Sequence, residues 1–166
     1  SREQLARISR NSKQDQGVAC DIHSAGYQPY KKALEKLPSN DQRPLIALDG
    51  ITNPQNLGMI IRSITASPAY GLLLPSKGCA DISALVIKAS AGTVFKGNIL
   101  RCESLAKALP AFVEKGFEVC TLSSHQATPL AEFKPQAPII YVLGNETEGV
   151  SKEIAALSKH RVGIPM

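Results

Sequence analysis

The sequence lacks the cysteine patterns that mark metal sites and disulfide frameworks. It contains four cysteines, no two of them form a C-x-x-C pair, and none stands near a histidine at the spacing of a zinc site. We therefore expect no metal, and reduced thiols in a cytoplasmic protein. The sequence also lacks a signal peptide and any apolar run long enough to cross a membrane, so we expect no membrane association.

Two common nucleotide-binding patterns are missing as well. No G-x-G-x-x-G fingerprint follows the first apolar strand, which argues against an NAD enzyme and against the commoner Rossmann-like methyltransferases. The spacing of Gly144 and Gly149 matches the two glycines of a phosphate-binding P-loop, but Val150 occupies the position of the P-loop lysine. Glu146 and Glu148 would repel a polyphosphate, so a cationic or neutral ligand fits this loop better. An ordinary strand-to-helix turn, with acids placed favourably at a helix N-terminus, explains the loop equally well.

The composition is that of one folded domain. The chain has 166 residues, of which 43% are hydrophobic and 20% are charged, and this is enough to bury a core. Its 19 basic residues outnumber its 14 acidic residues. That balance is compatible with a nucleic-acid partner, although many basic proteins bind nothing anionic.

Apolar runs and turn residues predict strands that alternate with helices. We expect strands over residues 17–22, 45–48, 71–74, 99–101, 117–122, 139–143 and 161–164. We expect helices over residues 29–37, 56–67, 82–89, 103–115 and 151–159, with short helices around Leu5 and from Thr128–Pro129 onward. This alternation predicts an α/β fold with an open, mostly parallel sheet and helices on both faces.

Two stretches carry the polar residues that are best suited to a binding site. The apolar strand Ile139–Leu143 ends at a glycine, and ligands of parallel α/β sheets bind at the carboxyl ends of strands. In the stretch 53–62, Asn56 can cap a helix, and Gly58 indicates that something approaches the backbone closely. Arg62 is surrounded in sequence by apolar residues, so we expect it to be nearly enclosed and to have an anionic partner. An arginine that extends its head into water is the alternative.

Together these stretches resemble the SpoU family of RNA 2′-O-ribose methyltransferases, in the SPOUT superfamily of knotted α/β enzymes. Residues 48–62 resemble the first family motif, with its N-x-G and following arginine. Residues 143–151 resemble the second motif, and residues 163–166 resemble the start of the third. Lys88–Gly92 matches a recurring segment between them, and Gln16–Ala19 resembles the segment before the catalytic domain in members with an extra N-terminal RNA-binding domain.

The resemblance covers about residues 16–166 and implies a division of the chain. Residues 1–40 would be a linker or the end of an N-terminal RNA-binding region, and residues 41–166 would form the SpoU-type catalytic domain. Family members continue beyond the third motif with a serine-leucine-asparagine segment and a final helix, which complete a deep trefoil knot. Because the sequence stops at Met166, the resemblance implies a catalytic domain without its last segment and an incomplete knot.

The resemblance also implies a cofactor, a substrate and an assembly. Family members bind S-adenosylmethionine in the knot and methylate a ribose 2′-hydroxyl in structured RNA, and we expect rRNA or tRNA as the substrate here. They are homodimers whose active site uses groups at the interface. Carried onto this chain, the cofactor would lie against Leu143, Gly144 and Ile164, with Asn145 and Met166 nearby. An RNA-binding module without catalytic activity is the alternative function.

Three residues would take part in the chemistry. Arg62 matches the first-motif arginine, which contacts RNA and has been proposed as the base in the family. A guanidinium is a poor base near neutral pH, so we assign Arg62 to gripping a phosphate and stabilising the developing alkoxide. Asn56 would orient the hydroxyl or hold Arg62, and Glu146 would order the cofactor loop and pair with Arg62. The chain departs from the family at Asn53, where aspartate is common, and at Thr147, where glycine is frequent.

Overall fold

The computed structural model describes residues 2–9, 17–18, 27–38, 40–123 and 127–165. The strands are β1 (Gln28–Pro29), β2 (Leu45–Leu48), β3 (Gly71–Pro75), β4 (Ile99–Cys102), β5 (Glu118–Leu122), β6 (Thr128–Pro129), β7 (Ile139–Leu143) and β8 (His160–Gly163). The helices are α1 (Arg2–Ser9), α2 (Tyr30–Lys36), α3 (Pro54–Ala66), α4 (Ala84–Ala89), α5 (Leu105–Glu114) and α6 (Lys152–Ala156), with a 3-10 turn, η1, at Thr93–Phe95.

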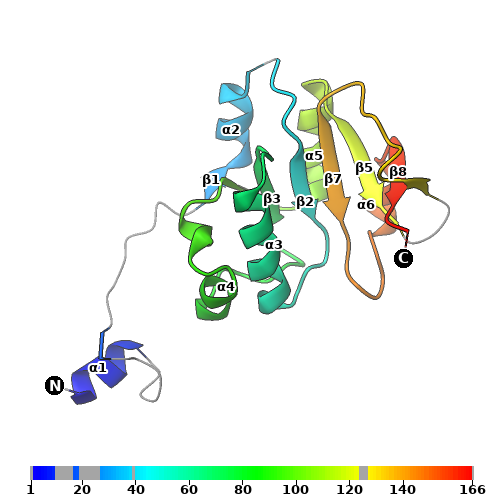
Figure 1. Ribbon diagram of the computed structural model, residues 1–166. Helices are drawn as coiled ribbons and strands as arrows, with labels where there is room; N and C mark the ends of the chain where they lie inside the picture. The colour runs from blue at the N-terminus through cyan, green and yellow to red at the C-terminus, as the bar shows by residue number, and fades with distance from the viewer. Residues whose placement is uncertain (1, 10–16, 19–26, 39, 124–126, 166) are drawn as a thin grey trace.

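The strands of the described residues form one sheet in the order β1-β4-β3-β2-β7-β5-β8-β6 (Figure 1). Every neighbouring pair is parallel. The predicted α/β fold with an open parallel sheet is therefore confirmed. The strand expected over residues 17–22 lies mostly outside the described residues.

Helices cover both faces of this sheet, as predicted. On one face, α2, α5 and α6 pack onto the strands through buried apolar side chains, among them Leu34, Leu109, Phe112 and Ile154. On the other face, α3, α4 and η1 do the same through Leu57, Ile61, Val86 and Val94. Because both faces of the sheet are covered, the central strands are nearly continuous hydrophobic runs.

The order of the strands places β7 at the centre of the sheet. From β2 the chain proceeds outward to β3 and β4, then crosses to β5 on the other side, and β7 later occupies the position between β2 and β5. The last residues of β2 and β7, Leu48 and Leu143, are direct neighbours in the register. The loops that follow the two strands therefore leave the same edge of the sheet side by side.

Three local predictions are wrong, and in one of them helix α6 ends at Ala156, before the expected end at residue 159. Thr128–Pro129 begins no helix: it is the edge strand β6, in which Pro129 lies opposite Gly163 of β8. A proline has no N–H to donate, and an edge strand can tolerate that loss. Helix α3 begins at Pro54, before the expected start at Asn56, because the side chain of Asn53 accepts a hydrogen bond from Gln55 N at 2.8 Å and caps the helix.

Candidate functional site

The loops after β2 and β7 are joined by two hydrogen bonds of Asp49, one through its backbone and one through its side chain. The backbone N–H of Asp49 donates to the carbonyl oxygen of Leu143 at 2.8 Å. Its carboxylate accepts from the backbone N–H of Ser151 at 2.7 Å, just before α6 begins. The two turns therefore lie side by side, and a single acidic side chain holds the start of α6 against the end of β2.

Asn145 is a second link between the same loops. Its amide nitrogen donates to the carbonyl oxygen of Gly50 at 2.9 Å, and its amide oxygen accepts from the backbone N–H groups of Thr147 and Glu148 at 2.9 and 3.3 Å. Each polar atom of this side chain thus has a protein partner. Asn145, predicted as a cofactor residue, shapes the loop through its side chain.

Residues 145–149 form a narrow loop that returns on itself. Asn145 and Gly149 exchange two backbone hydrogen bonds, at 2.9 and 2.8 Å. Gly144 lies directly against the returning limb: a Cβ added there would stand 2.1 Å from the carbonyl carbon of Gly149 and 2.2 Å from the nitrogen of Val150. Only glycine fits at position 144, so this backbone can pass close to a neighbouring group.

A cleft of about 740 Å³ opens beside this loop. It is bounded by the carboxyl ends of β5, β7 and β8 and by α6, which is where parallel sheets bind ligands. Four of the five residues predicted to bind the cofactor line it together: Leu143, Gly144, Asn145 and Ile164. The fifth, Met166, lies outside the described residues.

Asn56 and Glu146 connect α3 to the cleft. The amide nitrogen of Asn56 donates a hydrogen bond to the carboxylate of Glu146, which itself lines the cleft. Asn56 is half-buried in the first part of α3, whereas Glu146 is exposed in the loop after β7. Since Asn53 supplies the helix cap, the amide of Asn56 is free to make this contact. Two of the three predicted catalytic residues therefore meet at one edge of the cleft.

The third predicted catalytic residue, Arg62, is placed differently from our expectation. It is exposed to solvent, and within the described part of the chain its guanidinium makes no ion pair or hydrogen bond. The expected enclosure of Arg62 and its expected pairing with Glu146 are both wrong. Arg62 follows Asn56 at about 9 Å along the helix axis and is not among the residues that line the cleft.

Gly58 confirms the prediction of a close approach to α3. A Cβ at Gly58 would lie 2.5 Å from the Cβ of Ala89 and 2.8 Å from the carbonyl oxygen of Val86. Helix α4 therefore packs directly on the backbone of α3. This contact fixes the position of α3, and with it that of Asn56, relative to the sheet.

Arg161 is a cleft residue that sequence reasoning missed. It lies on β8 opposite Thr121 of β5, is exposed, and lines the cleft together with Thr121 and Ser123. A single arginine in a short strand is usually read as a solvent-facing residue. The pairing of β5 with β8, which the sequence does not reveal, places Arg161 beside Thr121 at the cleft.

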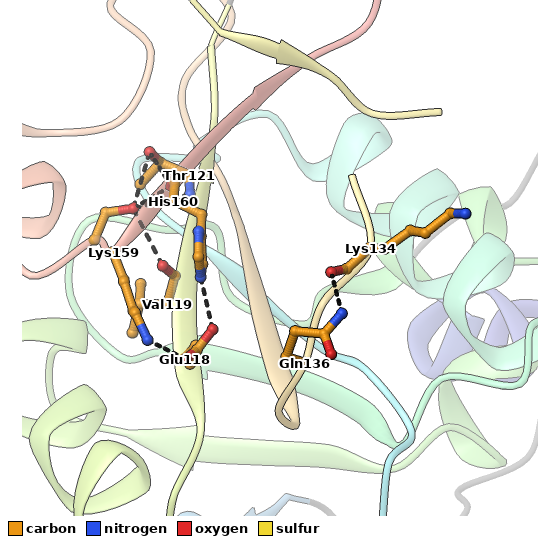
Figure 2. Close-up of polar contacts among 8 residues, drawn as sticks. Glu118, Val119, Thr121, Lys134, Gln136, Lys159 and His160 are labelled. Carbon is orange, nitrogen blue, oxygen red and sulfur yellow. Dashed lines mark hydrogen bonds and ion pairs between the residues drawn. The ribbon is translucent and has the colours of Figure 1, made fainter. Parts of the chain in front are cut away.

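A separate polar cluster holds β8 against β5 (Figure 2). Lys159 and His160 both contact the carboxylate of Glu118, with His160 Nε2 at 2.6 Å from Glu118 Oε2. Hydrogen bonds from Lys159 first and His160 second lower the pKa of the Glu118 carboxyl. The hydroxyl of Ser158 donates to the carbonyl oxygen of His160 at 2.6 Å and accepts from Thr121 N at 3.1 Å. These contacts set the position of β8 without using Arg161.

The described residues contain neither a metal-binding cluster nor a membrane-spanning helix. Among them there is no group of three or more histidine, cysteine, aspartate or glutamate side chains that could hold a metal ion. In the same residues, each helix is too short or too polar to span a bilayer.

Comparison with known proteins places these features in a family. The model of the SpoU rRNA Methylase family matches residues 43–166. An uncharacterized tRNA/rRNA methyltransferase of Mycolicibacterium vanbaalenii is 32% identical over 167 residues, covering 99% of this chain and 52% of that protein. Its counterpart in Mycobacterium leprae is 30% identical over 165 residues, covering 99% and 53%. The chain thus spans about half the length of the curated relatives it matches.

Solved structures of methyltransferases are also similar to this chain. The SpoU methyltransferase AviRb from Streptomyces viridochromogenes, in complex with the cofactor AdoMet, is 27% identical with a TM-score of 0.70, over 80% of this chain and 55% of that one. The AdoMet-bound rRNA methyltransferase from Sinorhizobium meliloti is 25% identical with a TM-score of 0.74, over 85% and 52%.

Proposed function

The chain belongs to the SpoU rRNA methylase family, and from this premise we propose that the protein transfers a methyl group from S-adenosylmethionine to a ribose 2′-hydroxyl of rRNA or tRNA. The observation that carries the proposal is the contact between Asn56 and Glu146 at the edge of the cleft. It joins the two motifs that the family resemblance had identified separately. The AdoMet complexes of two neighbouring structures support the choice of cofactor.

The cleft fits this cofactor in size and in chemistry. Its volume of about 740 Å³ is in the ordinary range for small-molecule sites. Leu143 and Ile164 offer apolar surface, Gly144 allows close approach to the backbone, and Glu146 and Glu148 place negative charge where a cationic ligand would be favoured. The cofactor supplies a methyl group activated by a sulfonium charge, so the protein has to position the hydroxyl and manage its proton.

Different side chains at the edge of the cleft would order the loop, orient the hydroxyl and contact the RNA. We propose that Glu146 orders the loop and, by accepting from Asn56, turns the amide of Asn56 toward the site. Asn56 then orients the attacking hydroxyl. Arg62 is exposed and has no protein partner in the described part of the chain, which suits a residue that grips an RNA phosphate and stabilises the developing alkoxide.

We further propose that the intact protein acts as a cytoplasmic homodimer. Ile164 borders the cleft yet is 61% exposed, and Leu157, just after α6, is 40% exposed. Apolar side chains at the edge of a binding site favour coverage by a second subunit. Residues 1–40 would be a linker or the end of an RNA-binding region, and residues 41–166 the catalytic domain.

Methyl transfer by the intact protein to total RNA tests the proposal. With labelled S-adenosylmethionine we expect incorporation into rRNA or tRNA, at a position whose 2′-oxygen resists alkaline cleavage. Arg62→Ala should lower transfer by about 10²–10³-fold, because it removes the phosphate contact, while the urea midpoint stays unchanged because Arg62 is exposed.

Lys115→Ala is the matched control, because Lys115 is an exposed cation beyond the end of α5, and α5 packs on the opposite face of the sheet from α3. Full activity of Arg62→Ala would remove Arg62 from the mechanism. Calorimetry with S-adenosylhomocysteine tests the cofactor separately: a protein that binds RNA but gives no heat with this ligand would be the non-catalytic RNA-binding module.

A further inference from the structure

Arg161 is a cation in the cleft that the structure itself leaves without a partner. Of the described residues that line the cleft, it is the single cation, beside the two carboxylates of Glu146 and Glu148. Its guanidinium forms no ion pair or hydrogen bond with either carboxylate, nor with any other group in the described part of the chain. An arginine without a protein partner in a ligand-sized cleft is available to an anionic group of the ligand.

Arg161 has no structural task on β8 that would explain its presence. The strand is held by Lys159 and His160, which both contact Glu118 (Figure 2). The hydroxyl of Ser158 adds a hydrogen bond to the carbonyl oxygen of His160. Val162, which follows Arg161 in the strand, is buried in a core cluster with Cys120 and Ile139. Because side chains alternate along a strand, Arg161 projects from the opposite face, beside Thr121 of β5, and it lines the cleft together with Thr121.

The charges of the cleft are separated along its length. Glu146 is tied to Asn56 on α3 and follows β7, whereas Arg161 lies on β8, with β5 between the two strands. At the usual spacing of neighbouring strands, the β7 and β8 backbones are about 10 Å apart. The cleft therefore has a negative end near α3 and a positive end on β8.

We propose that Arg161 binds the carboxylate of the amino-acid part of S-adenosylmethionine. This inference rests on the function proposed above. The cofactor carries a sulfonium and an ammonium, both positive, and one carboxylate, while the cleft carries two carboxylates and one guanidinium. The charges of the cleft thus mirror those of the ligand, and a planar guanidinium can hold a carboxylate through two parallel hydrogen bonds. Arg161 is a residue that selects and positions the cofactor, remote from the transferred methyl group.

Calorimetry with two ligands on the intact protein isolates this contact. S-adenosylhomocysteine contains the amino-acid part, whereas 5′-methylthioadenosine lacks it. For Arg161→Gln we expect the Kd of S-adenosylhomocysteine to rise about three- to tenfold, as for a partly solvated charge pair, and that of methylthioadenosine to stay unchanged. Arg161→Lys should recover part of the loss. In the transfer assay, KM for S-adenosylmethionine should rise while kcat stays constant.

The other possible outcomes of these measurements would contradict the proposed role of Arg161. Equal weakening of both ligands would place Arg161 against the nucleoside. Unchanged Kd values with a raised KM for RNA would assign it to a phosphate of the substrate. If the wild type binds S-adenosylhomocysteine and Arg161→Gln binds it as tightly, the inference alone fails; if the wild type binds neither ligand, the proposed function fails with it. Lys115→Gln controls for net charge, and urea midpoints control for folding.

Discussion

Replacing Gly144 with alanine is a direct test of how the loop builds the cleft. The new Cβ would lie 2.1 Å from the carbonyl carbon of Gly149, 2.3 Å from its oxygen and 2.2 Å from the nitrogen of Val150. All three are backbone atoms, so rotation of a side chain cannot relieve the overlap. The loop has to open, and the two backbone hydrogen bonds between Asn145 and Gly149 are lost.

The size of the effect follows from these two contributions. Overpacking costs about 1–3 kcal/mol, and each lost hydrogen bond costs about 1 kcal/mol. We therefore expect the free energy of unfolding to fall by about 3–5 kcal/mol in Gly144→Ala. Because residues 143–150 line the cleft, the Kd of S-adenosylhomocysteine should rise at least about tenfold.

Urea denaturation and calorimetry measure the two effects, and Gly78→Ala provides the matched control. Gly78 has a φ of +80° but no atom within 4 Å of an added Cβ, so alanine there should cost about 1 kcal/mol of backbone strain. Ligand binding should be unaffected in that variant. A Gly144→Ala protein with the urea midpoint and ligand affinity of the wild type would refute the reasoning about the loop.

Two further predictions concern titrating groups. The pKa of Glu118 is lowered from its ordinary value of 4.5 by Lys159 and then His160, so its stabilising effect is complete above that value and is lost as pH falls through the lower, folded-state pKa. Glu118→Gln should therefore lower the urea midpoint at pH 7 but not near pH 3, and an equal loss at both values would contradict the assignment. Burial raises the pKa of Cys102 to about 12 and that of Cys120 to about 11. Native protein at pH 8 should therefore resist iodoacetamide at both thiols, as peptide mass spectrometry can check, whereas unfolded protein should react.

Much of the fold could be predicted because its central strands are short apolar runs between turn residues. Ile139–Leu143 was expected as a strand and is β7 with the same bounds. The failure at Thr128–Pro129 has a local cause. A threonine-proline pair suits the start of a helix, and nothing in those residues reveals that a parallel partner, β8, lies beside them.

The site could be predicted in part. The meeting of Asn56 and Glu146 follows from two motifs whose loops leave adjacent strands. The apolar neighbours of Arg62 could not decide between its enclosure and its exposure, because they project from different sides of α3: Leu57 is buried, whereas Met59 is 54% exposed. Arg161 gave no signal, since its role depends on the pairing of β5 with β8.

The central position of β7 has a consequence for how the chain acquires its structure during synthesis. Leu45 of β2 pairs with Ile140 of β7, which is translated much later. At a typical rate of translation, roughly 5–20 s pass between the two residues, and during that time one edge of β2 has no partner. An unpaired strand edge invites association with other chains. Nascent chains halted before residue 139 should therefore depend on chaperones, and release of the full β7 segment should end that dependence.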